Sequence, residues 1–440
     1  MFTRKLMVAL LLLTALAAGL TGVWLQSPRP AMAQAGYAEL QLFTDVLSIV
    51  RRSYVEEVPV KDLVYGAIDG MLASLDPHSG FMPPDVYKEL KIDTRGEFGG
   101  LGIEVTIRDD TLTIVAPMED TPASRAGLAA GDRILKINEL FTKGMEIMEA
   151  VRLMRGAPGT EVTIIVMREG FEKPRAFTLK REFIKIKSIK SKMLEDGFGY
   201  VRITQFQERT AADLQRELDA LRKQGGNHPL KGLVLDLRNN PGGLLDQAVE
   251  VADLFLDKGL IVYTKGREAD AQMEFTAKAS GTEPGYPMVV IINGGSASAA
   301  EIVAGALQDH GRAVILGTQS FGKGSVQTIL PLGDDAGLRL TTARYYTPKG
   351  TSIQAKGITP DIEVRQAEVK ESGDRDQFRE KDLPNHFDGE QTEKPAKPKD
   401  QGEIKPRGTE ADRSDYQLMR ALDLLKGWQI FRGIGTPAGA

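Results

Sequence analysis

Residues 289–327 constrain the fold of this chain more than any other stretch. They open with the apolar run 289–292, whose length and β-branched side chains are typical of a buried strand in a parallel sheet. An Asn-Gly-Gly turn at 293–295 breaks the strand, and the small and apolar residues after it predict a helix. Ser298 would then lie at a helix N-terminus, where backbone N–H groups are free and negative charge is stabilised.

A second predicted strand, 313–317, leads to Lys323, which is flanked by glycines, so the loop backbone can bend close to another group. Each of these features also has an ordinary interpretation. Ser298 and Glu301 have the spacing of a capping box, in which the serine only caps the helix. A lysine between glycines is commonly a solvated loop residue.

Residues 184–366 alternate between strand and helix patterns. Strands are predicted at 200–206 and 233–237, and helices at 211–221 and 244–256. Such alternation is typical of an α/β fold, a mainly parallel sheet covered by helices, in which sites lie at the carboxyl ends of the strands. The residues that directly follow a predicted strand include Gly242, Gly243, Ser298 and Lys323.

Residues 95–183 have a different, β-rich character. A glycine turn at 99–102 enters a strand, a helix is predicted at 145–154, and a last strand at 162–167. Such a turn leaves N–H groups free to hold a terminal carboxylate, and the next strand edge can accept a peptide as an added strand. The predicted peptide-binding residues are Gly100, Leu101, Gly102 and Ile103. The alternative is a hairpin turn without a ligand.

The two ends of the chain have patterns of their own. Two basic residues precede the apolar stretch 6–25, which is typical of an export signal or of a membrane anchor. Helices are predicted at 37–54 and 64–75. Core packing is the ordinary interpretation of both, and a dimer contact is the alternative. Residues 370–410 are rich in charge and proline, as disordered linkers are, and an amphipathic helix is predicted at 414–433, docked on the core or on another subunit.

Composition excludes several kinds of chemistry. A net charge of −4 over 440 residues provides no electrostatic footprint for nucleic acid. The chain has no cysteine, which excludes disulfides and thiolate ligands, and its four histidines lie too far apart in sequence to predict a metal cluster. Neither a metal nor a cofactor is expected.

Three kinds of chemistry compete for the region around Ser298 and Lys323. Residues 317–323 have the spacing of a phosphate-binding loop, but Gly324 stands where serine or threonine is required, and a strand is predicted next instead of a helix. A Ser-His-Asp triad would use His310, which is expected about 18 Å away at the far end of the helix. The third candidate is a Ser-Lys dyad.

In a dyad, burial lowers the pKa of Lys323 from its reference value of about 10.4, and the neutral amine takes the proton of Ser298 as that oxygen attacks an acyl carbon. Gln327 can accept a hydrogen bond from the amine and orient it. The developing oxyanion needs two N–H donors. Ala299 can supply one, and the glycine turn at 241–243 can supply the other.

Together these stretches resemble the carboxyl-terminal processing proteases, a tail-specific family of serine peptidases with a Ser-Lys-Gln site and a PDZ domain. The matching stretches are 76–79, the PDZ-like motifs at 124–128 and 131–137, and the stretches 236–243, 295–301 and 321–327. The roles that the resemblance implies are Ser298 as nucleophile, Lys323 as base, Gln327 as its orienting partner, and Gly243 and Ala299 as the oxyanion hole.

The resemblance also implies an organisation into domains. The expected fold class is α/β, a mainly parallel-sheet protease core with a PDZ-like β-rich domain and an N-terminal helical segment. The expected boundaries are a signal peptide or anchor at 1–35, the helical segment at 36–94, the PDZ domain at 95–183, the core at 184–366, a charged linker at 367–413 and the amphipathic helix at 414–433.

The function expected from this resemblance is that of a serine endopeptidase that recognises and cleaves proteins with unstructured C-terminal tails. The protein would be periplasmic or otherwise extracytoplasmic, and held at the inner membrane if its N-terminal segment stays uncleaved. No nucleic acid partner is expected, while a homo-oligomer and an activator protein are left open.

Two alternatives are also left open. Ser296 is the main rival nucleophile, although it lies nearer the glycine turn and lacks the capping spacing to Glu301. The core could also be a non-catalytic scaffold for the PDZ unit.

Overall fold

The computed structural model describes residues 31–195, 197–226, 228–267, 272–333, 335–367 and 414–434. The chain divides into two compact units, one up to Phe81 and one from Met82 onwards. The apolar stretch at 6–25 and nearly all of the expected linker lie outside the described residues. Within the ranges given, no helix combines the length and the apolar character that crossing a membrane requires.

The first unit contains the two expected N-terminal helices, α2 (Ala31–Ser53) and α3 (Val60–Ala73), followed by the start of β1 (Gly80–Met82). The expected core packing is wrong for α2, where Leu40 is 62% and Phe43 is 45% exposed. Two helices of this size enclose too little volume to bury such side chains between them.

The second unit begins with α4 (Pro84–Arg95) and a β-rich region. Among the described residues, one sheet has the order β3-β4-β5-β7-β8, with β6 beside β5. Its strands are β3 (Ile103–Arg108), β4 (Thr111–Pro117), β5 (Arg133–Ile137), β6 (Leu140–Phe141), β7 (Glu161–Met167) and β8 (Arg175–Lys180). The remaining elements are α5 (Pro122–Arg125), α6 (Ile147–Met154), and the antiparallel pair β2 (Glu97–Gly100) and β9 (Glu182–Lys185).

The α/β region is built on a sheet of order β10-β11-β12-β15-β16-β19. β10 is antiparallel to β11, and every later pair along this order is parallel, which confirms the mainly parallel sheet. The strands are β10 (Ile189–Glu195), β11 (Phe198–Ile203), β12 (Gly232–Asp236), β15 (Met288–Ile292), β16 (Val314–Gly317) and β19 (Ile362–Glu363).

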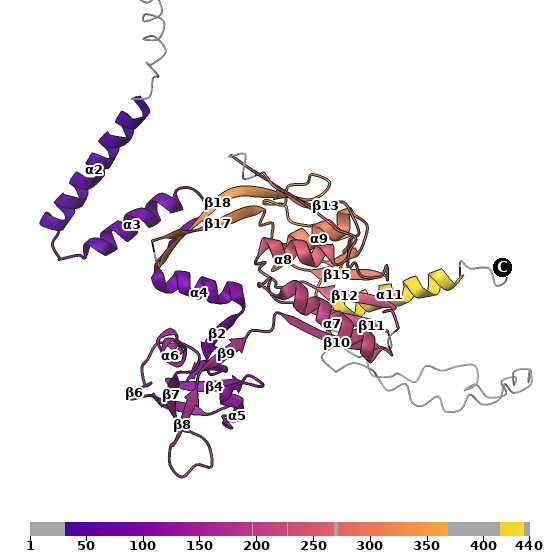
Figure 1. The fold of residues 1–440 in the computed structure, drawn as a ribbon, viewed down its shortest axis with the longest axis horizontal. Helices are drawn as coiled ribbons and strands as arrows, with labels where there is room; N and C mark the ends of the chain where they lie inside the picture. The colour runs from indigo at the N-terminus through magenta and orange to yellow at the C-terminus, as the bar shows by residue number, and fades with distance from the viewer. Residues whose placement is uncertain are drawn as a thin grey trace, which may run out of the picture. The chain divides into compact units, whose positions relative to one another are not determined.

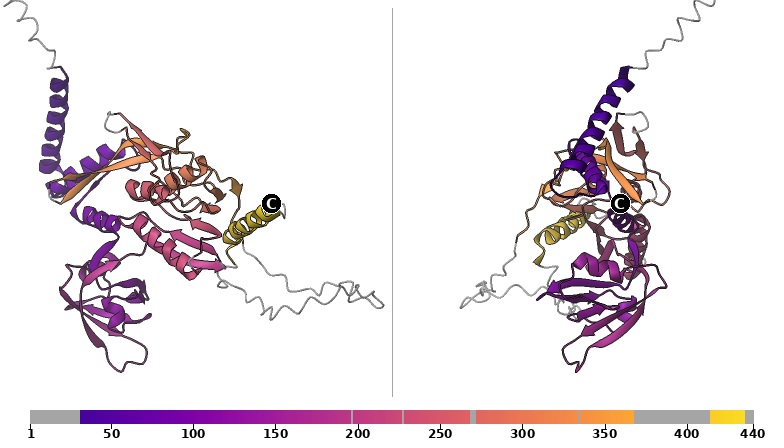
Figure 2. Two further views of the ribbon diagram at one scale, coloured as in Figure 1. Left: turned by 45° about the vertical axis from the view of Figure 1, so that its right-hand side comes forward. Right: turned by 90° about the vertical axis from the view of Figure 1, so that its left-hand side faces the viewer.

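Helices cover both faces of this sheet (Figures 1 and 2). α7 (Thr210–Gln224), α8 (Leu245–Asp253) and α9 (Ala299–Asp309) pack on one face through residues such as Leu214 and Val303. α11 (Tyr416–Ile434) packs on the other face, where Leu418, Leu422 and Leu425 join a buried cluster with Val289 and Ile291. The C-terminal helix therefore docks on the core of its own chain, one of the two arrangements expected.

A further sheet contains β14 (Glu274–Thr276), β13 (Leu260–Gly266), β18 (Ala336–Tyr346) and β17 (Ser325–Leu332), paired antiparallel in that order. β17 begins directly after the loop that carries Lys323. This sheet thus connects the lysine loop to a long strand that the sequence patterns did not predict, β18.

Candidate active site

The candidate residues meet at the carboxyl edge of the parallel sheet. The glycine turn at 241–243 follows β12, Ser298 follows β15, and Lys323 follows β16. These three strands are neighbours in the sheet, so the loops after them converge at one edge.

Ser298 precedes the first residue of α9 in an unusual backbone conformation. Its φ of 54° and ψ of −115° lie outside the regions that residues other than glycine ordinarily occupy. Its N–H donates a 2.8 Å hydrogen bond to Oε2 of Glu301, which is one half of the expected capping box. The carboxylate therefore stabilises a backbone that is strained on its own.

Glu301 does more than complete a capping box. Its Oε1 accepts hydrogen bonds from the Ser320 hydroxyl at 2.5 Å and from the Gly322 N–H at 2.7 Å. Its Oε2 accepts from the Lys323 N–H at 2.9 Å, beside the bond from Ser298. The side chain has no exposed surface, so one buried carboxylate joins the serine turn to the lysine loop.

The shared oxygen sets a limit on how far the two candidate residues can separate. Because Oε2 accepts from both Ser298 and Lys323, their backbone nitrogens lie within two hydrogen-bond lengths of each other. Hydrogen bonds to a charged acceptor are roughly twice as strong as neutral ones, and a buried carboxylate needs several of them. Losing this acceptor would leave four buried donors to find new partners.

The amine of Lys323 lies in a half-buried position that disfavours its charged form. Burial lowers the pKa of Lys323, and the positive charge of Arg339 on β18 lowers it further. Among the described residues, the amine makes no hydrogen bond or ion pair. These are the conditions in which a lysine can serve as a base.

Gln327 lies on β17 and does not bond to Lys323 within the described part of the chain. Its amide nitrogen donates to the Ser325 hydroxyl at 2.8 Å and, more weakly, to the Thr341 hydroxyl at 3.4 Å. With the nitrogen engaged in this way, the amide oxygen is the atom left to accept a hydrogen bond. The orienting role expected for Gln327 stays a prediction.

Two N–H groups lie beside the serine without an acceptor among the described residues, those of Ala299 and Gly243. The glycine turn packs closely against the serine, because a Cβ on Gly242 would lie 2.8 Å from the Ser298 Cβ and 3.0 Å from the Ala299 nitrogen. Gly243 has a φ of 141°, and a Cβ there would meet the Phe206 carbonyl oxygen at 2.1 Å. Side chains are therefore excluded where the turn approaches the serine.

The rival residues have structural partners. The buried hydroxyl of Ser296 donates to the Leu237 carbonyl oxygen at 2.8 Å and accepts from the Asn293 N–H at 3.0 Å. His310 follows the last residue of α9, and its Nε2 lies 2.7 Å from the Leu260 carbonyl oxygen. The loop at Lys323 enters a strand, as expected, and not the helix of a phosphate-binding loop.

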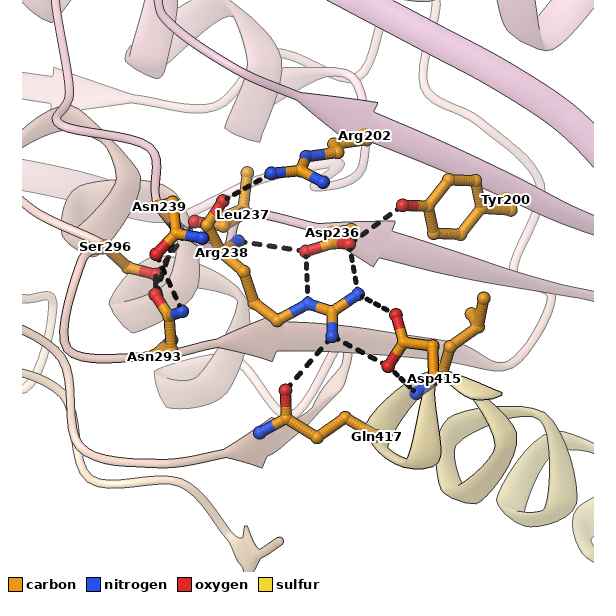
Figure 3. A network of polar contacts seen from close by, with 11 residues as sticks. Tyr200, Arg202, Asp236, Leu237, Arg238, Asn239, Asn293, Ser296, Asp415 and Gln417 are labelled. Atoms are coloured by element: carbon orange, nitrogen blue, oxygen red, sulfur yellow. Dashed lines mark hydrogen bonds and ion pairs between the residues drawn. The ribbon is translucent and has the colours of Figure 1, made fainter. Parts of the chain in front are cut away.

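An ion-pair network lies on the residues just before the glycine turn and joins them to the C-terminal segment (Figure 3). Asp236 at the end of β12 binds the Arg238 guanidinium, which also binds Asp415 and Gln417 of the C-terminal segment. Burial by itself would raise the pKa of Asp415, but the bonds and charge of Arg238 outweigh it and hold that pKa below its usual value. Arg238, three residues before the glycine turn at 241–243, thereby anchors the C-terminal helix.

Side-chain amides connect the turn to the serine loop. Asn239, with a φ of 55°, and Asn293 exchange two hydrogen bonds of 2.9 Å (Figure 3). The Ala297 N–H donates to the Asn240 carbonyl oxygen at 2.9 Å, and the Asn240 side chain accepts from Gly242. These hydrogen bonds therefore fix the glycine turn and the serine loop to each other.

Three of the four predicted peptide-binding residues line a small groove of about 210 Å³ between β3 and α6, and the fourth, Gly100, is not among its lining residues. Leu101, Gly102 and Ile103 form one wall, and Ile147 and Val151 of α6 form the other. Gly100 is the last residue of β2 and directly precedes Leu101 in the chain. The N–H groups of Leu101 and Gly102 donate to no acceptor among the described residues.

Sequence reasoning missed most of what Glu301 does. The capping spacing identified its bond to Ser298, but its three other donors lie 19 to 22 residues away. One signal could have found it: Glu301 is an acid within a run of small and apolar residues, where only a hydrogen-bonded carboxylate is tolerated. No group of acidic or histidine side chains suited to a metal ion occurs in the described ranges.

We expect Glu301→Gln to lower the free energy of unfolding by about 3 kcal/mol, because the amide nitrogen would face donors in place of an acceptor. Labelling of Ser298 by a serine-directed acylating probe should slow more than tenfold. Both are measured against Asp309→Asn, which removes a half-buried carboxylate at the other end of α9, away from Ser298. Labelling as fast as in the control would show that Glu301 does not position the serine.

Three family models match the chain. Peptidase family S41 matches residues 197–364, a PDZ domain matches 113–168, and the activating protease CtpB N-terminal domain matches 24–86. Among solved structures, the chain is similar to a photosystem II D1 C-terminal processing protease, with 31% identity, 74% of this chain and 92% of that chain covered, and a TM-score of 0.43.

Curated relatives match over most of their own length. A carboxy-terminal-processing protease of Bartonella bacilliformis is 47% identical over 92% of this chain and 94% of the relative. A carboxyl-terminal-processing protease of Synechocystis is 38% identical over 72% and 75%, and the carboxy-terminal processing protease CtpA of Bacillus subtilis is 35% identical over 76% and 70%. The chain therefore belongs to the carboxy-terminal processing proteases of peptidase family S41, serine proteases with a PDZ domain.

Proposed function

We propose that the protein is an exported endopeptidase that holds protein C-termini in its PDZ domain and cleaves by a Ser298-Lys323 acyl-enzyme mechanism. The single observation that carries the proposal is the Glu301 carboxylate, which hydrogen-bonds to the backbone N–H of both residues. A serine held beside a desolvated lysine has both groups that acyl transfer needs.

In the first half-reaction, neutral Lys323 takes the proton from the Ser298 hydroxyl as that oxygen attacks the scissile carbonyl carbon. The N–H groups of Ala299 and Gly243 stabilise the negative charge on the carbonyl oxygen. The lysine ammonium then gives its proton to the leaving amine, so the peptide bond breaks and an ester to Ser298 remains.

In the second half-reaction, Lys323 is neutral again and takes a proton from water, which attacks the ester. The ammonium returns a proton to the Ser298 oxygen, and the acyl product leaves with a new carboxyl group. Gln327 accepts a hydrogen bond from the lysine amine through its free amide oxygen and keeps it aimed at the serine.

The PDZ groove supplies recognition. The free N–H groups of Leu101 and Gly102 hold the terminal carboxylate of a substrate, and the edge of β3 pairs with its extended chain. Export is favoured by the apolar stretch at 6–25, with a periplasmic or otherwise extracytoplasmic location. The domain boundaries given above are part of this proposal.

We expect Ser298→Ala and Lys323→Ala each to reduce cleavage of a substrate with an unstructured C-terminal tail by at least about a thousandfold. Lys349→Ala, an exposed lysine in a glycine-containing turn, is the matched control. Cleavage is followed by gel and by mass spectrometry. Normal cleavage by either site variant would contradict the proposal and favour the non-catalytic scaffold.

We expect Arg339→Gln to move the acid limb of kcat/KM to higher pH. Arg339 disfavours the lysine ammonium, so its removal raises the pKa of Lys323, and a higher pH is then needed to make the amine neutral. Arg344→Gln, at an exposed arginine on the same strand, should leave the limb in place. An unmoved limb in Arg339→Gln would mean that Lys323 does not set the pH dependence.

We expect amidation of a substrate's C-terminus to raise KM about tenfold while kcat changes little, because the amide lacks the charge held by the groove. The control is a short peptide that spans only the cleavage site and should not depend on its terminus. Equal KM values for the acid and the amide would rule out carboxylate recognition at residues 100–103.

A further inference from the structure

The lysine loop is held from outside by a second loop that the proposed function does not use. Residues 353–357, called the outer loop here, lie between β18 and β19. The Ala355 N–H donates to the Gly322 carbonyl oxygen at 2.9 Å. The Gly324 N–H donates to the side-chain oxygen Oε1 of Gln354 at 3.0 Å. The outer loop therefore contacts the backbone on both sides of the proposed base.

This contact gives a reason for the two glycines that flank the lysine. A Cβ on Gly324 would overlap the backbone nitrogen of Gln354, and a Cβ on Gly322 would lie 3.1 Å from the Gly357 nitrogen. Gly322 also has a φ of 90°, which residues with a side chain rarely adopt. The glycines are thus needed because another backbone approaches the lysine loop closely.

The outer loop stores backbone strain at the residue that makes one of these contacts. Ala355 has a φ of 60°, in the left-handed region that is unfavourable for a residue with a Cβ. The N–H groups of Lys356 and Gly357 both donate to the carbonyl oxygen of Ile353, whose side chain is buried. A strained residue persists only where its surroundings fix it, so the outer loop is held in one conformation against the lysine loop.

The peptide groups before and after the lysine each have a side-chain acceptor. Glu301 accepts from the Lys323 N–H at 2.9 Å, and Gln354 accepts from the Gly324 N–H. Because peptide groups are planar, fixing both planes fixes the direction in which the lysine side chain leaves the backbone. A general base must come within hydrogen-bond reach of the proton that it takes, so this direction matters for catalysis.

We propose that Gln354 is a positioning residue for Lys323, which acts through the Gly324 N–H and keeps the lysine side chain directed at Ser298. The inference rests on the proposed function, because it assigns a support to the base of the same acyl transfer. In this role Gln354 contacts neither the substrate nor the serine, and no proton of its own moves.

The test compares Gln354→Ala with Gln354→Glu. The alanine variant has no acceptor for the Gly324 N–H, so we expect kcat to fall at least about tenfold with KM within twofold. A glutamate keeps an acceptor oxygen, so its kcat should stay within about threefold of the unaltered protein. A carboxylate near Lys323 favours the ammonium and moves the acid limb to higher pH, so kcat values are compared on the plateau above that limb.

Labelling of Ser298 by a serine-directed acylating probe separates a misplaced base from a loss of folded protein. In Gln354→Ala the probe should label every site in the end, but at least about tenfold more slowly. Unfolding of part of the sample would instead lower the fraction of sites labelled and leave their rate unchanged, and that result would overturn the inference.

The matched control is Gln215→Ala, at an exposed glutamine on α7. The inference also fails if Gln354→Ala matches this control in kcat and labelling rate, or if Gln354→Glu is impaired as much as Gln354→Ala. Ser298→Ala and Lys323→Ala in the same assay separate the two claims. If both are inactive and Gln354→Ala is not impaired, only the role of Gln354 fails, whereas normal cleavage by either one contradicts the proposed function itself.

Discussion

The arrangement of the proposed active site depends on the four hydrogen bonds that the Glu301 carboxylate accepts. Ser298 and Lys323 are 25 positions apart in the chain and follow different strands, so nothing local keeps them together. A buried charge must be satisfied, and here it is satisfied by the turn before α9 and by the loop before β17. The hydrogen bonds that satisfy the buried carboxylate also hold the serine in its strained conformation and keep the lysine loop beside it.

Other contacts in the core fix the loops that surround the serine. The parallel sheet brings three loops to one edge, and the asparagine pairs join the glycine turn to the serine loop. Behind the turn, Arg238 lies between Asp236 and Asp415, so the docking of α11 reaches the same loop. An oxyanion hole made of backbone N–H groups is effective only if its donors are in place before the reaction. These contacts would hold the proposed donors, Ala299 and Gly243, in place.

Local patterns predicted much of this protein. The short apolar runs identified β12, β15 and β16, and the glycine turns after them pointed to the edge where Ser298 and Lys323 meet. What they could not predict is non-local. The other donors of Glu301 lie in another loop, 19 to 22 residues along the chain, which no local pattern connects to the serine. The apolar spacing of α2 predicted burial, but amphipathic spacing says which face is apolar and not whether anything covers it.

Native-state hydrogen exchange of the backbone amides of Ser298, Gly322 and Lys323 tests the central role of Glu301 most directly. If its carboxylate holds both segments, these three amides exchange only when the core unfolds, with the same protection as amides in the middle of β15. All three should lose that protection together in Glu301→Gln. Fast exchange in the unaltered protein, at the rate of exposed loop amides such as that of Gly350, would contradict the account.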